Sequence, residues 1–350
     1  MDINTLLNTV VEKGSSDLII TEGAAPMMRI NGSLSPATNE ILNAEQAKEL
    51  IFGILNSSQI ETFERSKELN LGYEIKGLAR FRVNVHYQKQ TVAAALRPIP
   101  KTIPSQEELN LPNTIADFAA LERGLVLVTG PTGSGKTTTQ ACMVNIINST
   151  QSRHIITIED PIEYIHMNKK SLIEQREVGT DTDSFSNALI NALRQNPDVI
   201  LVGEMRDIDT IHTALTAAET GHLVISTLHT NDAVQAIDRI IDVFPPHQQA
   251  QIRVQLSLSL QGIIAQQLIP RMDGRGLIVA TEVMVATSAV RNLIRKSSIH
   301  EIYSMLEIGA KYGMQGMDSS IKNLYKNKTI SYDEALSHAI NQENFDKMIS

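Results

Sequence analysis

The sequence is poor in the features that mark disulfide-bonded, membrane-spanning and secreted proteins. It contains a single cysteine, Cys142, which excludes an internal disulfide and a zinc site built from several cysteines of one chain. No apolar run approaches the roughly 18 residues that a membrane-spanning helix needs. The first residues lack the basic region and apolar core of a secretion signal. These absences predict a cytoplasmic protein that meets a membrane only at a surface or through a partner.

Basic side chains are also in the minority. The 31 Lys and Arg residues are outnumbered by 39 Asp and Glu residues, which gives a formal net charge of −8. Because proteins bind nucleic acids chiefly through basic side chains on phosphates, we expect no nucleic-acid partner. Hydrophobic residues make up 42% and charged residues 20% of the chain, a balance typical of globular proteins. A length of 350 residues indicates two or three domains.

The first expected domain, residues 1–98, mixes helical and strand patterns. Residues 80–87 alternate between apolar and polar side chains, which predicts a strand with one buried face. The polar face of this strand carries Arg80 and Arg82, and Arg97 follows the next predicted strand. On this pattern alone, the arginines would lie on a solvated sheet face.

Prolines recur in and beside residues 99–113, which we therefore expect to be a linker. Beyond it, residues 114–350 form the second expected domain, in which short apolar runs alternate with candidate helices. These runs are Leu125–Val128, Ile155–Ile158, Val199–Val202 and Leu223–Ile225. Strands that are apolar on both faces and separated by helices indicate an α/β fold with a parallel sheet covered on both sides. Residues 287–340 are expected to be mainly helical.

A glycine-rich motif follows the first of these runs. Residues 130–137 read Gly-Pro-Thr-Gly-Ser-Gly-Lys-Thr and match the phosphate-loop pattern G-x-x-x-x-G-K-[ST]. Glycines let the loop amides close around phosphates, Lys136 can reach the β- and γ-phosphates, and Thr137 offers a hydroxyl to Mg²⁺. The motif therefore predicts ATP and Mg²⁺ as cofactors. The expected nucleotide-binding residues are Gly130, Pro131, Thr132, Gly133, Ser134, Gly135, Lys136, Thr137 and Thr138.

Hydrolysis also requires a group that orders Mg²⁺ and one that activates water. Two acidic sites follow apolar runs, one within residues 159–163 and the other at Glu204. Since ligand sites in open α/β sheets lie at the carboxyl ends of strands, we expect both near the phosphate loop; the alternative is a helix cap or a surface charge. His229 follows a predicted strand and is placed to sense a γ-phosphate. His222 precedes the same strand, and its position fits a structural role equally well.

Together these segments resemble the ATPase superfamily that drives type II secretion and type IV pili. The most specific part is the stretch Leu-Arg-Gln-Asn-Pro-Asp-Val-Ile-Leu-Val-Gly-Glu-Met-Arg-Asp at residues 193–207, which resembles the Walker B region of that superfamily. Residues 158–163 resemble its Asp box and residues 220–230 its His box. The resemblance covers nearly the whole chain, including the Arg-Phe-Arg-Val-Asn strand at residues 80–84.

Within the superfamily, the chain is most similar to the PilT-type ATPases that retract type IV pili. From its length we expect no additional N-terminal domain of the kind that many extension and secretion members carry, and its single cysteine excludes their four-cysteine metal motif. Residues 289–296 resemble the retraction motif Ala-Ile-Arg-Asn-Leu-Ile-Arg-Glu, and residues 313–315 with Asp318 also fit. Val290 and Lys296 depart from that motif, the second by a reversal of charge. A specialised motor, such as that of the bundle-forming pilus, therefore remains an alternative.

The resemblance implies a hexameric ring of subunits, each with a smaller PAS-like α+β domain followed by a RecA-like P-loop ATPase domain. It also implies roles for individual residues. Glu163 would be the base that activates water. Glu204 would order Mg²⁺ with Thr137, directly or through a water molecule. His229 would sense the γ-phosphate, and His222 belongs to the same box.

The resemblance further implies functions for the arginines and for the retraction motif. In this family, arginines of the N-terminal domain approach nucleotide at a subunit interface, which favours Arg82 and Arg97 ahead of Arg80. Residues 289–296 are expected to form an amphipathic helix with Val290, Leu293 and Ile294 toward the core and Arg291, Arg295 and Lys296 outward. The resemblance implies that this helix couples hydrolysis to pilus disassembly; the alternative is an ordinary packing helix. The residues expected to act in coupling are Arg291, Leu293 and Arg295.

The resemblance thus implies an ATP-driven motor for pilus retraction and twitching motility. It would act on an inner-membrane pilus platform protein, alone or with a second retraction ATPase, and would dock peripherally at the inner-membrane pilus machine. A close alternative is a pilus-extension or type II secretion ATPase, which the missing metal motif disfavours. A nucleic-acid-translocating ATPase is disfavoured by the acidic charge. A nonhydrolysing nucleotide-binding scaffold is disfavoured by the two intact acidic sites.

Overall fold

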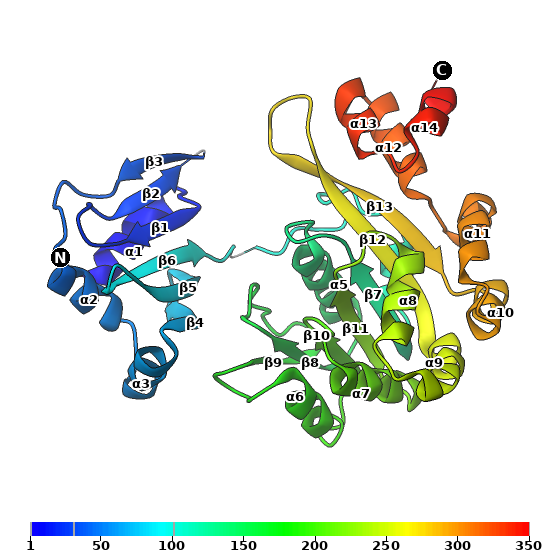
Figure 1. The fold of residues 1–350 in the computed structure, drawn as a ribbon, viewed down its shortest axis with the longest axis horizontal. Coiled ribbons are helices and arrows are strands. Elements are labelled where there is room, and N and C mark those ends of the chain that lie inside the picture. Colours follow the sequence, from blue (N-terminus) through cyan, green and yellow to red (C-terminus); the bar gives the residue numbers. More distant parts are fainter. Residues whose placement is uncertain (1, 31, 101, 350) are drawn as a thin grey trace. The chain divides into compact units, whose positions relative to one another are not determined.

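The protein, described here by a computed structural model that covers residues 2–30, 32–100 and 102–349, consists of two compact units (Figure 1). Unit 1 contains the described residues up to Thr102 together with Asp160–Ile165. Unit 2 contains Ile103–Glu159 and the described residues from His166 onward. The domains expected from the sequence are continuous stretches of chain, and no sequence pattern indicates that Asp160–Ile165 groups with the first unit.

Unit 1 is an antiparallel sheet with helices on one face. Its elements are α1 (Ile3–Glu12), β1 (Asp17–Ile20), β2 (Met27–Ile30), β3 (Ser33–Pro36), α2 (Ala44–Phe52), α3 (Ser57–Ser66), β4 (Glu68–Ile75), β5 (Ala79–Gln88) and β6 (Thr91–Pro98). The 6-stranded sheet has the order β3-β2-β1-β6-β5-β4. The expected alternation is confirmed in β5, where Phe81 and Val83 are fully buried and Arg82 is exposed. Since the three helices share one core with the apolar strand faces, the arginines lie on the opposite face of the sheet.

Unit 2 carries the larger, 7-stranded sheet. Its first elements are α4 (Thr114–Ala119), β7 (Gly124–Thr129), α5 (Lys136–Thr150), β8 (His154–Glu159), β9 (Leu172–Glu177), α6 (Phe185–Ala192), β10 (Val199–Val202), α7 (Ile208–Glu219) and β11 (Leu223–Leu228). The later elements are α8 (Ala233–Asp242), α9 (Pro246–Ser259), β12 (Leu260–Pro270), β13 (Leu277–Val285), α10 (Ser288–Lys296), α11 (Ile302–Ile308), α12 (Met317–Lys326), α13 (Tyr332–His338) and α14 (Gln342–Ile349), with short 3₁₀ helices at Ile299–Glu301 and Ala310–Tyr312.

The strand order β13-β12-β7-β11-β10-β8-β9 places the phosphate-loop strand β7 inside the sheet. All neighbours pair in parallel except β12 with β13. Alternate residues of β7 enter different cores: Leu125 and Leu127 pack with α6 to α9, whereas Val126 and Val128 pack with α4 and α5. Both faces of the sheet are therefore covered by helices, and the predicted α/β class with a parallel core is confirmed.

The structure also contains strands that the apolar runs did not indicate. Strand β9 lies at one edge of the sheet and is largely polar, so it lacks the run that marks a strand buried on both faces. In the part of the chain that the structure describes, no helix has both the length and the apolar character of a membrane span.

Candidate active site

The phosphate loop connects β7 to the amino end of α5, as the motif predicts. Gly130, Gly133 and Gly135 adopt positive φ angles of 147°, 81° and 86°. The loop carbonyls of Gly130 and Pro131 accept hydrogen bonds of 2.8 and 2.9 Å from Lys136 Nζ. A helix amino terminus directs free amides and a partial positive charge toward this loop, which suits it to phosphate. Of the remaining predicted residues, Ser134 is buried, Pro131 and Thr132 are exposed, and Thr137 and Thr138 are half-buried.

A glutamine on the neighbouring strand β12 holds the phosphate loop from the side. Gln266 Nε2 donates a hydrogen bond of 2.6 Å to the Ser134 carbonyl oxygen, and both residues are buried. The Gln266 carbonyl oxygen would lie 2.3 Å from a Cβ atom at Gly130, so only glycine fits there. Sequence reasoning missed Gln266 because nothing local distinguishes it from its neighbours in the strand.

The Walker B carboxylate and the His-box histidine meet at the same sheet edge as the phosphate loop. Strand β11 lies between β7 and β10, so residues that follow these three strands are neighbours. His229 Nε2 lies 3.5 Å from Glu204 Oε2, and Arg206 Nε lies 2.7 Å from the same oxygen. Arg206 was not singled out in the sequence, although it stands within the Walker B stretch.

Hydrogen bonds from threonine hydroxyls connect the carboxyl ends of β7, β10 and β11. Thr129, the last residue of β7, bonds through its hydroxyl to the carbonyl oxygen and the hydroxyl of Thr230. The Thr227 hydroxyl donates to the Gly203 carbonyl oxygen at 2.6 Å. The phosphate loop, His229 and Glu204 are consequently held in fixed relation by bonds within unit 2.

The oxygen donors at this edge suit a small hard cation. The Thr137 hydroxyl lies in the first turn of α5, and the Glu204 side chain is 16% exposed. Hydroxyl and carboxylate oxygens are ligands that Mg²⁺ prefers. The absence of a side chain at Gly130 lets the loop backbone pack against the Gln266 carbonyl oxygen and the Ser134 hydroxyl.

His222 lies at the opposite edge of the sheet. Its carbonyl oxygen accepts a hydrogen bond from the Gly124 amide at the start of β7, and its ring Nδ1 lies 3.0 Å from the Ala217 carbonyl oxygen in α7. The whole of β11 separates it from His229, roughly 20 Å at about 3.3 Å per residue. Within one chain, His222 is therefore removed from the phosphate loop and connects α7 to β11, and its place in the catalytic set stays a prediction.

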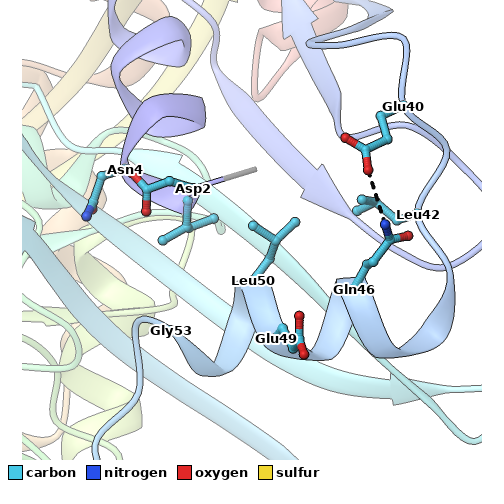
Figure 2. A pocket seen from close by; sticks show the side chains of 9 residues that line it. Asp2, Asn4, Glu40, Leu42, Gln46, Glu49, Leu50 and Gly53 are labelled. Carbon is cyan, nitrogen blue, oxygen red and sulfur yellow. Dashed lines mark hydrogen bonds between the residues drawn. The ribbon is translucent and has the colours of Figure 1, made fainter.

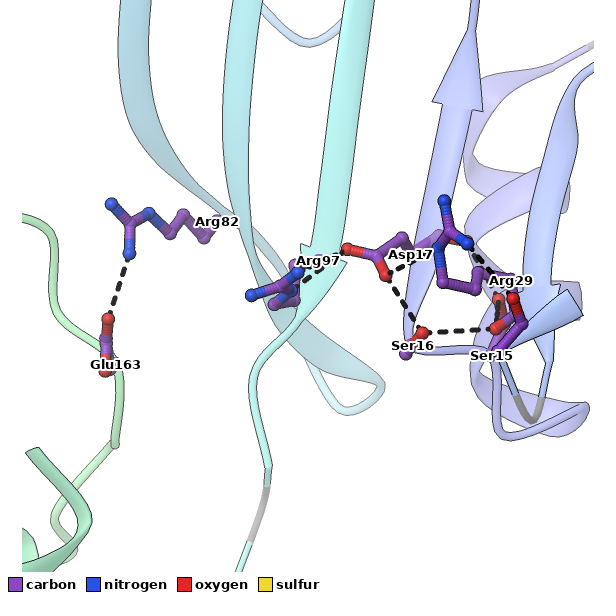
Figure 3. Close-up of polar contacts among 8 residues, drawn as sticks. Ser15, Ser16, Asp17, Arg29, Arg82, Arg97 and Glu163 are labelled. Carbon is purple, nitrogen blue, oxygen red and sulfur yellow. Dashed lines mark hydrogen bonds and ion pairs between the residues drawn. The ribbon is translucent and has the colours of Figure 1, made fainter. Parts of the chain in front are cut away.

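Two of the three arginines in unit 1 lie directly opposite each other on neighbouring strands. Arg82 of β5 pairs in register with Arg97 of β6. Arg82 Nη1 lies 3.0 Å from Glu163 Oε1, and Arg97 donates two hydrogen bonds of 3.0 and 2.8 Å to Asp17 Oδ1 (Figure 3). Both arginines are exposed, so their charged ends remain within reach of other groups.

Arg80 is held within its own sheet. Its side chain is 17% exposed and packs over Gly72 of β4, where a Cβ atom would lie 2.3 Å from a guanidinium nitrogen. Its Nη1 atom is 4.0 Å from a carboxylate oxygen of Glu74. Arg80 is accordingly the least exposed of the three arginines.

The outward orientation expected for the arginines of α10 is wrong for Arg291. Its guanidinium donates to the carbonyl oxygens of Ser257, Leu258 and Ala286 and to the Gln261 side chain at 2.8–2.9 Å. Burial, and then the neighbouring Arg295 charge, lower the pKa of Arg291. Arg291 thus binds the carbonyls left free where α9 ends.

Arg295 and Leu293, the other two residues expected to act in coupling, differ in their exposure. Arg295 is exposed, with one hydrogen bond of 3.2 Å from Nη1 to the Ser257 hydroxyl. Leu293 is only partly buried against the core, whereas Val290 and Ile294 are fully buried. The inner face of α10 is therefore centred on Val290 and Ile294.

A surface hollow in unit 1 has different chemistry. It lies beside α2 and is lined by Asp2, Glu40 and Glu49 together with Gln46, which donates to Glu40 at 3.1 Å (Figure 2). Three carboxylates would repel the phosphates of a nucleotide. The phosphate loop of unit 2 is therefore the better candidate for nucleotide.

Comparisons with known proteins match this chain from end to end. The model of the type II/IV secretion system protein family matches residues 3–340. The chain is 46% identical over 345 residues to the type IV pilus retraction ATPase PilT of Pseudomonas aeruginosa, a match that covers 99% of this chain and 100% of that protein. It is 44% identical over 339 residues to the type IV pilus ATPase PilU of the same organism, a match that covers 97% of this chain and 89% of that protein.

The fold is similar to a solved structure as well. A crystal structure of the pilus retraction motor PilT with bound ADP matches with a TM-score of 0.93 and 43% identity. The match covers 99% of this chain and 100% of that one.

Proposed function

This chain belongs to the type II/IV secretion system protein family and to its PilT-type branch, and on this basis we propose that it is an ATP-hydrolysing motor that powers type IV pilus retraction. The observation that carries the ATPase assignment is the meeting of the phosphate loop, Glu204 and His229 at one sheet edge. The retraction assignment is supported by full-length similarity to a PilT ATPase, together with the match to an ADP-bound PilT structure.

The proposed chemistry assigns one task to each group. Lys136 exchanges its bonds to loop carbonyls for bonds to the β- and γ-phosphates of ATP. Mg²⁺, held by Thr137 and Glu204, would neutralise the negative charge of those phosphates. Glu163 accepts a proton from the attacking water, and His229 contacts the γ-phosphate.

Arg82 and Arg97 complete the proposed site from a neighbouring subunit. They would stabilise the charge that develops during phosphoryl transfer, as arginines supplied by a partner do in other nucleotidases. This role requires a ring, which we propose to be a homo-hexamer.

The proposed setting is the cytoplasmic face of the inner membrane, where the ring would dock on the pilus platform protein. The similarity of this chain to both PilT and PilU leaves two arrangements, in which it works alone or together with a second retraction ATPase. Complementation of single and double deletion strains distinguishes the two.

The ATPase assignment is tested with Lys136→Ala. Removal of the cation that faces the phosphates should abolish hydrolysis, measured as phosphate release by purified rings. Retained folding and assembly serve as the control, and near-normal turnover by the variant would overturn the assignment.

The direction of force is tested in cells by imaging labelled pili. A deletion strain should carry long pili that do not shorten, and the wild-type gene but not the Lys136→Ala gene should restore shortening. Loss of pili instead of their persistence would identify an extension motor.

A further inference from the structure

The segment that carries Glu163 is an irregular loop whose two ends are anchored in unit 2. It leaves the sheet after Glu159, the last residue of β8, and the chain rejoins unit 2 at His166, ahead of β9. Between them, Asp160–Ile165 forms neither helix nor strand and groups with unit 1. Because no regular structure orients the loop, the position of Glu163 depends on its contact with Arg82 and on how the two ends of the loop are held.

One side chain bonds to both ends. Gln175 Nε2 donates a hydrogen bond of 3.1 Å to Glu159 Oε1, and Gln175 Oε1 accepts one of 2.8 Å from the His166 amide. Its strand β9 pairs with β8 so that Gln175 stands opposite Thr157, two residues before Glu159 and on the same face.

The Glu159 end of this connection is rigid. Glu159 is 8% exposed, and its carboxylate accepts a second hydrogen bond, 2.6 Å long, from the hydroxyl of the fully buried Thr157. Two hydrogen-bond donors, from Thr157 and Gln175, therefore fix one carboxylate oxygen of Glu159. The other end of the Gln175 amide accepts from His166, so this side chain links His166 to the fixed carboxylate.

We propose that Gln175 is a positioning residue for hydrolysis. It holds the two ends of the Asp160–Ile165 loop together and so places Glu163 to activate the attacking water. This inference rests on the proposed role of Glu163 as the general base. The side chain has one donor group and one acceptor group on a terminal amide, and the two loop ends need one of each.

The first test is Gln175→Met, which keeps the length of the side chain and removes both hydrogen bonds. We expect kcat to fall about 10- to 100-fold, because a misplacement of about 1 Å can cost that much. KM for ATP, nucleotide affinity and ring assembly should stay unchanged, because the phosphate loop is untouched. Gln151→Met is the matched control: Gln151 Nε2 bonds to the Ala119 carbonyl oxygen at 3.0 Å, in contact with α4 instead of the loop, and this variant should keep wild-type kcat.

An exchange variant tests the bonding pattern itself. In Glu159→Gln combined with Gln175→Glu, the new amide donates to the new carboxylate, which retains an oxygen for the His166 amide. We expect this double variant to recover most of the activity that Gln175→Met loses. It also keeps the proposal testable if Gln175→Met does not fold.

The Glu163→Gln background separates this inference from the proposed function. If Gln175 acts through Glu163, then Gln175→Met should lower residual single-turnover rates little further in that background. An unchanged kcat for Gln175→Met, a full additional loss in the Glu163→Gln background, or a folded but inactive exchange variant would overturn the proposal. Normal turnover by Glu163→Gln would instead refute the assignment of the base.

Discussion

At the scale of single residues, the charged groups of the candidate site are paired with protein atoms. Lys136 bonds to loop carbonyls, Glu204 lies against Arg206, and Arg82 lies against Glu163. The Arg82–Glu163 pair is 46% and 36% exposed on its two sides, and pairs of this kind contribute only about 0–1 kcal/mol. A nucleotide can therefore replace Glu163 as the partner of Arg82 at little cost in free energy.

The two acidic residues should fail in different ways when each becomes an amide. Glu163→Gln should bind ATP normally and lose turnover, because an amide cannot accept the proton of water. Glu204→Gln should lose turnover and also respond abnormally to Mg²⁺, because it removes a charged oxygen donor. Turnover and nucleotide affinity are measured across a Mg²⁺ titration. Identical Mg²⁺ dependence in both variants would contradict the division of roles.

At the scale of helices and strands, side chains from one element hold the ends of another. Arg291 of α10 occupies the carbonyls at the end of α9. Glu282 of β13 is 2% exposed and accepts a hydrogen bond of 2.9 Å from the Ala233 amide at the start of α8, and the Met317 amide at the start of α12 also lowers its pKa. A negative charge at a helix amino terminus is favourable, but its burial is costly.

Arg291→Ala should destabilise the protein instead of uncoupling it. The substitution leaves several carbonyl oxygens without their charged donor, which should cost roughly 2–4 kcal/mol. Chemical denaturation of unit 2 measures the loss. Asn292→Ala, at an exposed position of the same helix, is the control and should change stability by less than about 0.5 kcal/mol.

The coupling hypothesis is better tested at Arg295. Its side chain is exposed, and Arg295→Ala removes a single hydrogen bond to the Ser257 hydroxyl. We expect folded rings with normal ATP hydrolysis and pili that do not retract. Normal retraction by the variant would identify α10 as a packing helix only.

Glu282 should make stability depend on pH. Burial raises its pKa from an ordinary 4.5 to about 7, with the charges of Asp232 and Asp318 acting in the same direction against the two amide hydrogen bonds. A raised pKa contributes stability that is complete below pH 4.5 and lost as the pH rises through 7.

The expected size of that loss is on the order of 3 kcal/mol between pH 5 and 8. In Glu282→Gln this part of the pH dependence should vanish. The free energy of unfolding of both proteins, measured across this range, tests the assignment, and parallel curves for the two would contradict it.

At the scale of the whole molecule, unit 1 offers a sheet face that its own helices do not cover. Arg82 and Arg97 stand opposite each other on that face, an arrangement of like charges that destabilises a sheet. Their partners Glu163 and Asp17 offset part of this cost. An anion supplied by a neighbouring subunit would offset more of the repulsion between Arg82 and Arg97. For this reason we expect the two arginines to act at a subunit interface of the ring.

Mixed rings test whether these arginines serve a neighbour. Arg82→Ala and Arg97→Ala should each lower hydrolysis, by as much as ~10³-fold where the arginine stabilises the transition state. When either is mixed with Lys136→Ala subunits, activity should partly return, because a Lys136→Ala subunit supplies the arginine to an intact phosphate loop. Full activity of both single variants would show that the arginines only lie on a solvated sheet face and take no part in hydrolysis.

The sequence by itself determined the parts of this protein that depend on neighbours in the chain. The phosphate loop, the Walker B carboxylate and His229 each stand directly after an apolar run, and such runs form parallel strands because both of their faces must be buried. Alternation along β5 likewise determined which face of that strand carries arginine.

Only the tertiary structure decided which distant groups bond to one another. Gln266 is 132 residues from Ser134 in the chain, and Gln175 is 16 residues from Glu159 on another strand. The pairing of strands in the sheet brings each glutamine to its partner. Helical periodicity predicted an outward Arg291, but it cannot show that the end of α9 presents free carbonyls to that side. Backbone groups left unpaired by one element must find donors in another, and a local pattern does not contain the second element.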